Sequence, residues 1–492
     1  MNVLLVYPEF PDTYWSFKHA LVFEGKRSAF PPLGLITISA MLPSGWEKRL
    51  VDLNVTALTE EAIEWADMVF ASAMLVQQDS LREVISRCKN ARKRIVVGGP
   101  FVTTKHQDIG ADHIFIGEAE STLPEFLWDL ELGAAKPVYS SEERPALSLT
   151  PIPDFHIADL ASYSAMSVQY SRGCPFQCEF CDIIEIYGRV PRTKSSEQMI
   201  AELDALLAAG WRGMVFIVDD NFIGNKKSVK KFVPELAAWS NRNGYPFSFI
   251  TEASVNLAED DELLEMMRQA RFTRVFLGIE TPVEASLKET HKLQNTHRDL
   301  LDSIHKIQSY GMEVMAGFIV GFDNDPDDIF ERQIEFIRAS GIPLAMVGLL
   351  NALPDTQLWR RLEKEGRLLE ESHGNNTDCS LNFIPRMDAA RLVEGYKQIL
   401  RTIYSPREYY QRALDCLSHL VQDVPEHRYN LLKEARSFSR LVFRLGILDP
   451  ERREFWHYLR SAFRLHRRYF AYAMVLAAMG YHFRKLTEEY CT

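Results

Sequence analysis

Short apolar runs alternate with segments of helical periodicity over most of this chain. The runs have strand length, and apolar residues recur three and four positions apart in the segments between them, as in amphipathic helices. Strands separated by helices predict parallel sheets covered on both faces, so we expect an α/β fold. In the N-terminal part the predicted strands lie at 2–8, 48–54, 66–74, 94–100 and 113–120.

A second β/α series follows and contains six predicted strands. Six parallel strands separated by helices favour an open, partial (β/α)6 barrel over a closed barrel of eight. Active sites of such barrels lie at the carboxyl ends of the strands. The six strands are predicted at 165–171, 213–222, 246–255, 273–281, 313–322 and 344–354.

The two series suggest where the domains divide. Residues 1–135 are predicted to form a doubly wound parallel sheet, and residues 165–384 the barrel. Residues 136–164 between them contain four prolines and no clear period, so we interpret them as a linker with little regular structure. From 385 to 492 the pattern is all-helical and rich in arginine and aromatic residues.

Charge and cysteine content narrow the function class. The net charge of −11 argues against a general nucleic-acid-binding surface, although residues 385–492 hold 19 basic and 12 acidic residues. Seven cysteines in 492 residues favour a reducing, cytoplasmic setting over a disulfide framework. The apolar run 469–483 is shorter than the roughly 20 residues that span a bilayer, so no transmembrane segment is expected.

Three closely spaced thiols follow the first strand of the second series: Cys174, Cys178 and Cys181. They suit a soft metal centre, but a structural zinc site or a [4Fe–4S] cluster usually takes four protein ligands. No cysteine or histidine occurs in the next twenty residues. We therefore favour an iron–sulfur cluster with one iron open to a substrate or cofactor, over a zinc site or buried thiols.

The spacing Cys-x3-Cys-x2-Cys, with Phe180 before the last cysteine, resembles the signature loop of the radical S-adenosylmethionine (SAM) superfamily. The resemblance implies that the amino and carboxylate groups of SAM chelate the fourth iron. An electron from a donor such as flavodoxin or ferredoxin would then cleave SAM to a 5′-deoxyadenosyl radical. The backbone at Phe180 would contact the adenine.

Further segments resemble this superfamily in the order of its strand motifs: 216–222, 276–281, 317–325 and 350–359. Simpler interpretations exist for individual residues: the 219–221 turn could cap the following helix, and Glu280 could be an unpaired surface carboxylate. Against the second, a glutamate that ends an apolar run would need a partner. The resemblance implies SAM contacts at Asp219, Asp220, Asn221, Glu252, Glu280, Gly317 and Gly321.

A parallel α/β domain ahead of such a barrel resembles the cobalamin-binding class of the superfamily. The segments Gly-Gly-Pro (98–100) and Gly-Glu-Ala-Glu (117–120) match motifs of that class. No Asp-x-His-x-x-Gly motif is present, so the corrin binds without a lower histidine or the domain keeps only its fold. The resemblance implies cobalamin contacts at Ser72, Gln77, Gly98, Gly99 and Gly117.

The segment 379–400 resembles the helical extension of a subgroup that includes hopanoid and bacteriochlorophyll side-chain methylases. The predicted reaction is cobalamin-dependent methylation of an unactivated carbon on a hydrophobic small-molecule substrate of the terpenoid or tetrapyrrole type. The basic helices would contact an anionic membrane or only cover the barrel. Two alternatives stay open: radical cyclisation, rearrangement or another SAM-derived transfer, and a non-catalytic iron–sulfur or zinc scaffold or sensor.

Overall fold

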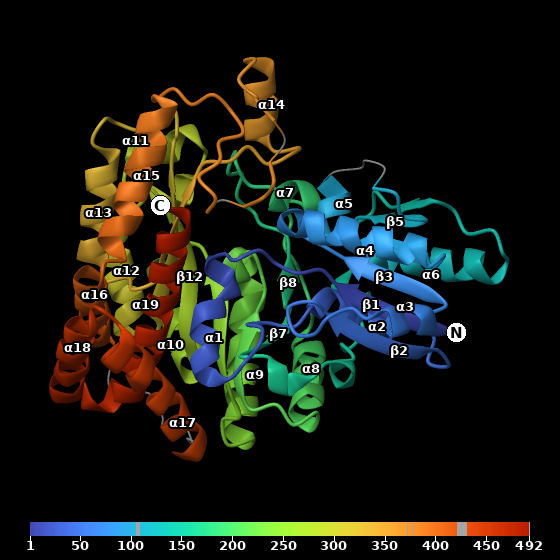
Figure 1. Ribbon diagram of the computed structural model, residues 1–492, viewed down its shortest axis with the longest axis horizontal. Coiled ribbons are helices and arrows are strands. Elements are labelled where there is room, and N and C mark those ends of the chain that lie inside the picture. The colour runs from blue at the N-terminus through green and yellow to red at the C-terminus, as the bar shows by residue number, and fades with distance from the viewer. Residues whose placement is uncertain (105–108, 371, 376, 421–430, 492) are drawn as a thin grey trace.

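Two six-stranded parallel sheets lie side by side in the computed structural model, followed by a helical C-terminal region (Figure 1). Residues 1–104, 109–370, 372–375, 377–420 and 431–491 are described by the structure. Every strand pair within the two large sheets is parallel, which confirms the predicted α/β class.

The N-terminal sheet has the strand order β2-β1-β3-β4-β5-β6. Residues 3–6 of β1 are fully buried because helices cover both faces, and this explains the unbroken apolar run. Its strands are β1 (Asn2–Tyr7), β2 (Glu47–Asp52), β3 (Met68–Ser72), β4 (Arg94–Gly98), β5 (His113–Ile116) and β6 (Val138–Ser140). Its helices are α2 (Leu33–Met41), α3 (Glu60–Trp65), α4 (Gln78–Asn90), α5 (Pro100–Thr104) and α6 (Ala119–Glu131).

Strand β6 lies inside the segment expected to be an irregular linker. It adds an edge strand beside β5, and Tyr139 stacks on Phe115 with ring centroids 5.3 Å apart. The Tyr139 hydroxyl donates to Asp129 at 2.9 Å. A three-residue strand among prolines has no periodic signal, and a single buried tyrosine fixes its place. The remainder holds only short 3-10 turns at Leu147–Leu149, Phe155–Ile157 and Leu160–Ser162.

The second sheet has the order β14-β13-β12-β11-β10-β7, so its first and last strands are both edges and the barrel is open, as predicted. Its strands are β7 (Met166–Val168), β10 (Gly213–Ile217), β11 (Phe247–Ala253), β12 (Phe272–Glu280), β13 (Glu313–Val320) and β14 (Ala345–Leu349). Its helices are α7 (Ile183–Ile186), α8 (Ser196–Ala208), α9 (Lys226–Arg242), α10 (Asp261–Gln269), α11 (Glu284–Glu289), α12 (Leu300–Ser309), α13 (Ile329–Ser340) and α14 (Gln357–Lys364). Two further short strands, β8 (Ser171–Arg172) and β9 (Arg192–Thr193), pair antiparallel, and the segment between them holds the three cysteines and α7.

An early segment of the chain, residues 10–32, leaves the N-terminal sheet and reaches both edges of the open barrel. The Tyr14 hydroxyl donates to the carbonyl of Val347 in β14 at 2.9 Å. At the other edge, the amide of Ala165 donates to Ala29 at 2.9 Å, just before β7. The segment includes α1 (Lys18–Glu24), which packs against the C-terminal helix α19 (Figure 1).

The C-terminal helices cover the outside of the barrel near β14. The Tyr404 hydroxyl donates to Ala345 of β14 at 2.6 Å, and Arg412 is buried, donating to the carbonyls of Ile342 and Ile403. No helix in the described part of the chain is long and apolar enough to cross a membrane. The helices are α15 (Ala389–Ile403), α16 (Pro406–His419), α17 (Leu431–Leu441), a π-helix (Val442–Leu448), α18 (Arg452–Leu465) and α19 (Phe470–Tyr490).

Candidate active site

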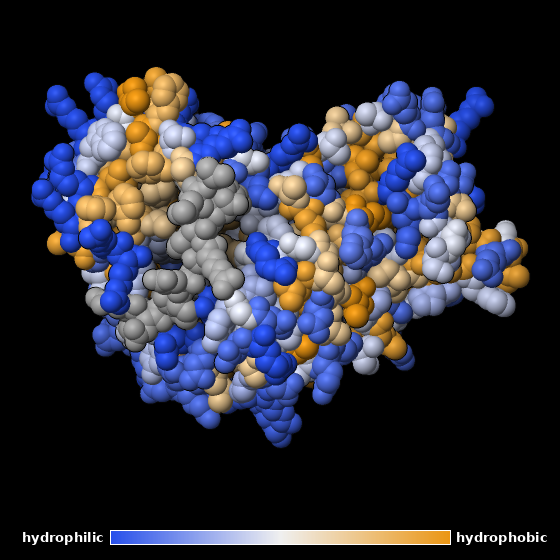
Figure 2. Space-filling model, turned by 90° about the horizontal axis from the view of Figure 1, so that it is seen from below, coloured by the Kyte–Doolittle hydropathy of each residue, from blue (hydrophilic) through white to orange (hydrophobic). Residues whose placement is uncertain are grey.

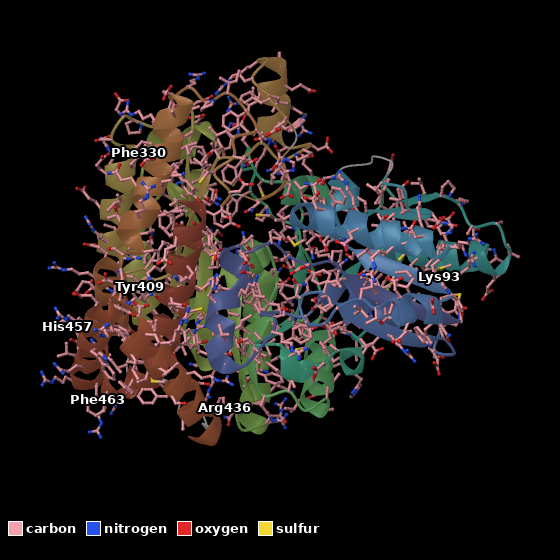
Figure 3. The ribbon with its side chains drawn as sticks, in the orientation of Figure 1. Lys93, Phe330, Tyr409, Arg436, His457 and Phe463 are labelled. Carbon is pink, nitrogen blue, oxygen red and sulfur yellow. The ribbon has the colours of Figure 1, made fainter. Side chains whose placement is uncertain are left out.

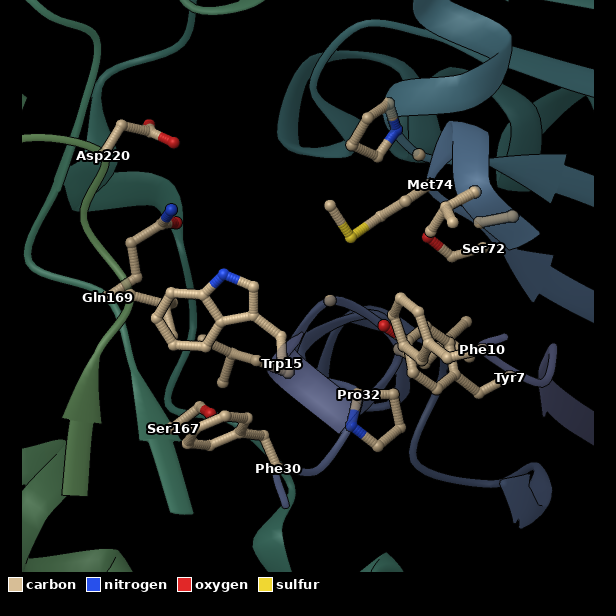
Figure 4. Close-up of a pocket in the computed structure, with 18 of the residues that line it drawn as sticks. Tyr7, Phe10, Trp15, Phe30, Pro32, Ser72, Met74, Ser167, Gln169 and Asp220 are labelled. Atoms are coloured by element: carbon tan, nitrogen blue, oxygen red, sulfur yellow. The ribbon is translucent and has the colours of Figure 1, made fainter. Parts of the chain in front are cut away.

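A large cleft of about 980 Å³ lies between the two sheets. Its lining comes from the carboxyl ends of strands in both sheets and from residues 9–41. In Figure 4, Gln169 and Asp220 enter from the barrel side, Ser72 and Met74 from the N-terminal domain, and Trp15 lies between them. Ligands of parallel α/β sheets bind at such strand ends, so this cleft is the candidate active site.

The cysteine loop lies between β8 and α7, and its three thiols are free. The backbone of the loop turns back on itself here, since the Cys181 amide donates to the Cys178 carbonyl at 3.2 Å. Burial, followed by the neighbouring Asp182 and the other two thiols, raises the pKa of Cys181. Two side-chain amides donate to the sulfurs: Asn221 Nδ2 lies 3.6 Å from Cys174 Sγ, and Gln294 Nε2 lies 3.6 Å from Cys178 Sγ. Three thiols with N–H donors fit an iron–sulfur cluster.

Asp219 anchors the strand that enters this loop. Its buried carboxylate accepts hydrogen bonds from the amide of Tyr170 at 2.7 Å and the hydroxyl of Ser171 at 2.6 Å. Burial raises the pKa of Asp219 to about 6, and these hydrogen bonds oppose the rise. Asp219 does not line the cleft, so these two hydrogen bonds give it a structural role, and the expected SAM contact at Asp219 stays a prediction. Asn221 likewise contacts Cys174 and Ser254.

Asp220 and Glu252 are among the carboxylates that line the cleft near the cysteine loop. Asp220 Oδ2 is buried and accepts no hydrogen bond within the described part of the chain. Burial and then Asp219 and Asp182 raise the pKa of Asp220 to about 7, while burial and then Asp220 and Asp219 raise that of Glu252 to about 8. Carboxylates held this way favour a cation, and SAM carries both a sulfonium and an ammonium group.

Glu280, at the end of β12, does have the partner that an acid ending an apolar run requires. Lys292 Nζ lies 2.6 Å from its carboxylate, and both side chains are nearly buried. Burial alone would lower the pKa of Lys292, but Glu280 and the Cys178 thiol raise it above its ordinary value. The ammonium also lies 5.8 Å from the ring centroid of Phe180. Lys292 is thus a permanent cation beside the cysteines.

The other expected SAM residues lie in two places. Gly317 lines the cleft, where a Cβ would stand 3.1 Å from the Phe276 ring and would press on it. Phe180 and Gly321 do not line the cleft. Phe180 packs against Phe322, with ring centroids 6.1 Å apart.

Four of the five residues expected to contact cobalamin line the cleft at strand ends: Ser72, Gly98, Gly99 and Gly117. Gly99 has φ +98°, and a Cβ there would lie 2.5 Å from Ser72 Oγ, so this turn requires glycine. These features fit a large flat cofactor placed against backbone. Gln77 is the exception because it is buried, donating to Pro8 O at 2.6 Å and accepting from the Met74 amide.

The Gly-Glu-Ala-Glu segment ties the N-terminal domain to the cysteine loop. Arg172, two residues before Cys174, contacts Glu118 at 2.6 Å and Glu120 at 2.8 Å, and Arg192 contacts Glu118 at 2.6 Å. Burial alone would raise the pKa of Glu120, but Arg172 outweighs it and the pKa is lowered. These carboxylates therefore hold the two domains in register across the cleft.

An aromatic floor, formed by Trp15, Phe30, Phe216 and Phe276, covers the inside of the barrel. The Trp15 indole is parallel to the Phe216 ring, with centroids 5.9 Å apart and an interplanar angle of 4°. Trp15 also lies 5.2 Å from Phe276, and Phe30 lies 5.2 Å from Phe216. Figure 4 shows Trp15 at the centre of the cleft with Phe30 below it.

The sequence did not reveal four residues of this site: Trp15, Arg172, Lys292 and Gln294. Trp15 stands more than 150 positions before the barrel strand it joins, so no local pattern points to it. Arg172 borders the cysteine motif, but its partners are in another domain. Lys292 and Gln294 lie at a short 3-10 turn (Leu293–Asn295) after α11, and a turn of three residues gives no periodic signal in the sequence.

Three family models match successive parts of the chain. The B12 binding domain matches residues 27–127, and the radical SAM superfamily matches residues 168–337. A domain of unknown function, DUF4070, matches residues 356–492. The order of these matches follows the two sheets and the helical region.

Curated relatives align over most of the chain. An uncharacterised methyltransferase of Synechocystis sp. is 43% identical over 99% of this chain and 92% of its own length. A hopanoid C-2 methylase of Rhodopseudomonas palustris is 36% identical over 93% of this chain and 88% of its own length. A bacteriochlorophyllide d C-12(1)-methyltransferase of Chlorobaculum tepidum is 22% identical over 76% of this chain and 82% of its own length.

Solved structures show the same fold. The cobalamin-dependent SAM radical enzyme OxsB, with aqua-cobalamin and SAM bound, covers 99% of this chain and 80% of its own, with a TM-score of 0.63 and 16% identity. The radical SAM methyltransferase TsrM from Kitasatospora setae covers 89% of this chain and 95% of its own, with a TM-score of 0.58 and 12% identity.

Together these findings confirm the predicted radical SAM enzyme with a [4Fe–4S] cluster, SAM and cobalamin as cofactors, and methyl transfer as its chemistry. The alternative of a non-catalytic iron–sulfur or zinc scaffold or sensor is not supported. With a relative 43% identical over nearly its whole length, the chain belongs to the cobalamin-binding radical SAM methyltransferases.

Proposed function

We propose that this enzyme methylates an unactivated carbon on a large, apolar, multi-ring substrate of the triterpenoid type. The observation that carries the proposal is the aromatic floor inside the barrel. It consists of four rings from three parts of the chain, and the cleft above it measures about 980 Å³. Such a surface holds flat hydrocarbon by apolar contact and stacking, without polar groups to position a charge.

Similarity to known enzymes supports the same substrate class. The relative named a hopanoid C-2 methylase is 36% identical over 93% of this chain, whereas the bacteriochlorophyllide methyltransferase is 22% identical over 76%. A pentacyclic hopanoid is therefore the substrate to test before a tetrapyrrole.

Different residues of the cleft are proposed to bind the different cofactors. Cys174, Cys178 and Cys181 are the proposed ligands of the cluster, and Asp220 and Glu252 the groups that face the cationic part of SAM. The buried Glu280–Lys292 pair offers one negative and one positive charge to the amino-acid part of SAM. The strand ends at 72, 98, 99 and 117 would support the corrin. When bound, the cluster and SAM supply a radical and cobalamin carries the methyl group.

The setting of the reaction follows from the cysteines. All seven are free thiols, and free thiols persist in a reducing compartment, so we place the enzyme in the cytoplasm. A small electron-transfer protein such as flavodoxin or ferredoxin is the proposed donor to the cluster.

Product analysis tests this function. The anaerobically reconstituted enzyme, with SAM, hydroxocobalamin, dithionite and a hopanoid, should give one S-adenosylhomocysteine and one 5′-deoxyadenosine for each methylated product. Cys174→Ala should abolish all three products, whereas Cys379→Ala, which removes a cysteine outside the loop, should not. Deoxyadenosine without methylated product would favour a cyclisation or rearrangement. Unchanged SAM cleavage in Cys174→Ala would overturn the catalytic assignment.

A further inference from the structure

The π-helix and α18 expose a group of large apolar side chains at the far end of the C-terminal region. These side chains are between 41% and 72% exposed, whereas neighbouring residues such as Phe455 and Tyr458 are buried. We call this group the apolar end patch. Figure 2 looks onto this end of the molecule and shows hydrophobic residues gathered at the left, where α17 and α18 lie. The patch consists of Phe443, Ile447, Leu448, Trp456, Phe463 and Leu465.

Packing between the two helices makes the patch continuous. The Trp456 indole donates to the carbonyl of Gly446 at 2.9 Å. A Cβ at Gly446 would lie 2.8 Å from the Trp456 ring, so the indole rests directly on the π-helix beside Ile447. Phe463 stands seven residues, or two helical turns, after Trp456 and therefore on the same side of α18.

The patch is surrounded by positive charge. Residues 435–470 contain nine arginines and three acidic residues, a net charge of +6 in a chain whose total is −11. One of the three acids, Asp449, is buried and paired with Arg484. On α18 the exposed residues Arg453, Trp456, Arg460 and Phe463 follow one another at three- and four-residue spacing. Figure 3 shows His457 and Phe463 at the outer edge of this end.

Alternating arginines and large apolar side chains on one helix face match a bilayer with anionic headgroups. Binding to a soluble protein partner would not require the patch to be so uniformly positive. Nor is contact with an acidic surface on a second copy of the chain needed to explain this charge. We propose that the apolar end patch and its arginines dock this enzyme on an anionic lipid surface. A triterpenoid substrate, as proposed above, would reside in that surface, but the docking itself needs neither substrate nor cofactor chemistry.

Vesicle co-sedimentation of the full-length holoenzyme, without substrate, tests the proposal. We expect binding to phosphatidylcholine vesicles that contain phosphatidylglycerol, and little to pure phosphatidylcholine. Arg460→Glu with Arg464→Glu should weaken binding at least about 25-fold, since each arginine near such a surface contributes about fivefold. Phe463→Ser with Leu465→Ser should weaken it about tenfold or more. Salt should reduce binding because the attraction is screened beyond roughly 10 Å.

Matched controls lie at the other end of the molecule. Leu132→Ser and Arg82→Glu remove an exposed apolar side chain and an exposed arginine from the N-terminal domain, and both should bind like the wild type. Circular dichroism and the thermal unfolding midpoint verify that each variant is folded. Equal binding by all variants, or no binding to anionic vesicles, would overturn the proposal. The proposal would also be overturned if light scattering showed that the wild type is a dimer and that only the Phe463→Ser/Leu465→Ser variant is a monomer. Methylation of a substrate dispersed in detergent does not require vesicle binding, so the proposed function is tested separately from the docking.

Discussion

Replacing Glu252 by glutamine should make the empty protein more stable and the SAM complex weaker. Glu252 faces the cleft near Asp220, and no ion pair or hydrogen bond to its carboxylate is found in the described part of the chain. Burial, Asp220 and Asp219 raise the pKa of Glu252 from 4.5 to about 8. The folded protein therefore holds a proton on this group that the unfolded chain has lost.

The sign and size follow from that difference. Between pH 4.5 and pH 8 the folded state binds more protons, so Glu252 makes the free energy of unfolding fall as pH rises, by up to about 1.4 kcal/mol per pH unit. At pH 7.5 the full effect would be about 4 kcal/mol, and partial exposure of the carboxylate to water reduces it to about 2–4 kcal/mol. Glutamine does not ionise and removes this cost.

SAM binding should change in the opposite direction. The wild-type affinity should rise from pH 6 to pH 8 as Asp220 and Glu252 ionise, because the ligand brings positive charge. Losing one charge-assisted contact costs about 1.5–3 kcal/mol, so Glu252→Gln should weaken SAM binding about 10- to 100-fold.

Two measurements check this pair of effects. Thermal unfolding of the cofactor-free protein from pH 6 to pH 9 should show a higher midpoint and a flatter pH dependence for Glu252→Gln. Calorimetric titration of the reconstituted protein should show the weaker SAM affinity. Glu235→Gln, on the exposed face of α9, is the matched control and should change neither. Unchanged stability and unchanged affinity in Glu252→Gln would refute the idea that this carboxylate is held for a cation.

Three other substitutions test the rest of the site. Trp15→Ala should weaken binding of an apolar multi-ring substrate about 30-fold while the SAM affinity stays constant. Trp128→Ala, at an exposed site, is the control and should not weaken substrate binding. Equal substrate affinities of Trp15→Ala and the wild type would contradict the aromatic floor. Arg172→Met removes the ion-pair partner of Glu120 and leaves Glu118 with Arg192 alone, and it should cost about 3–5 kcal/mol in chemical unfolding. An unchanged free energy of unfolding would contradict the role of Arg172 in holding the two domains together. Gly99→Ala should lower hydroxocobalamin affinity about tenfold in absorption titrations, while Gly45→Ala, with open space around it, should have no effect.

Much of the fold could be predicted because its signals are local. Helix and strand periods alternate within windows of a few residues, and that alternation implies parallel sheets and an open barrel. The spacing of Cys174, Cys178 and Cys181 is local too, and the missing fourth ligand pointed to a cofactor-bound iron. Glycines at strand ends, such as Gly99, were identified for the same reason.

The tertiary structure decided what the side chains do. Asp219 and Gln77 had the right types and positions for cofactor contacts, yet their hydrogen bonds are made within the protein. Lys292 was identified as a residue of the site only from its contact with Glu280 in the structure.

The sequence-based prediction and the structure differ most in the segment 10–32 and in the contacts between the domains. Trp15 reaches the barrel interior, and Glu118 meets Arg172, although neither contact has any periodic trace in the sequence. The sequence by itself determined the elements and the cluster loop, since hydrophobic period and ligand spacing act over short distances. Which strands and side chains from distant parts of the chain share one cleft depends on long-range packing, and only the folded molecule determines that.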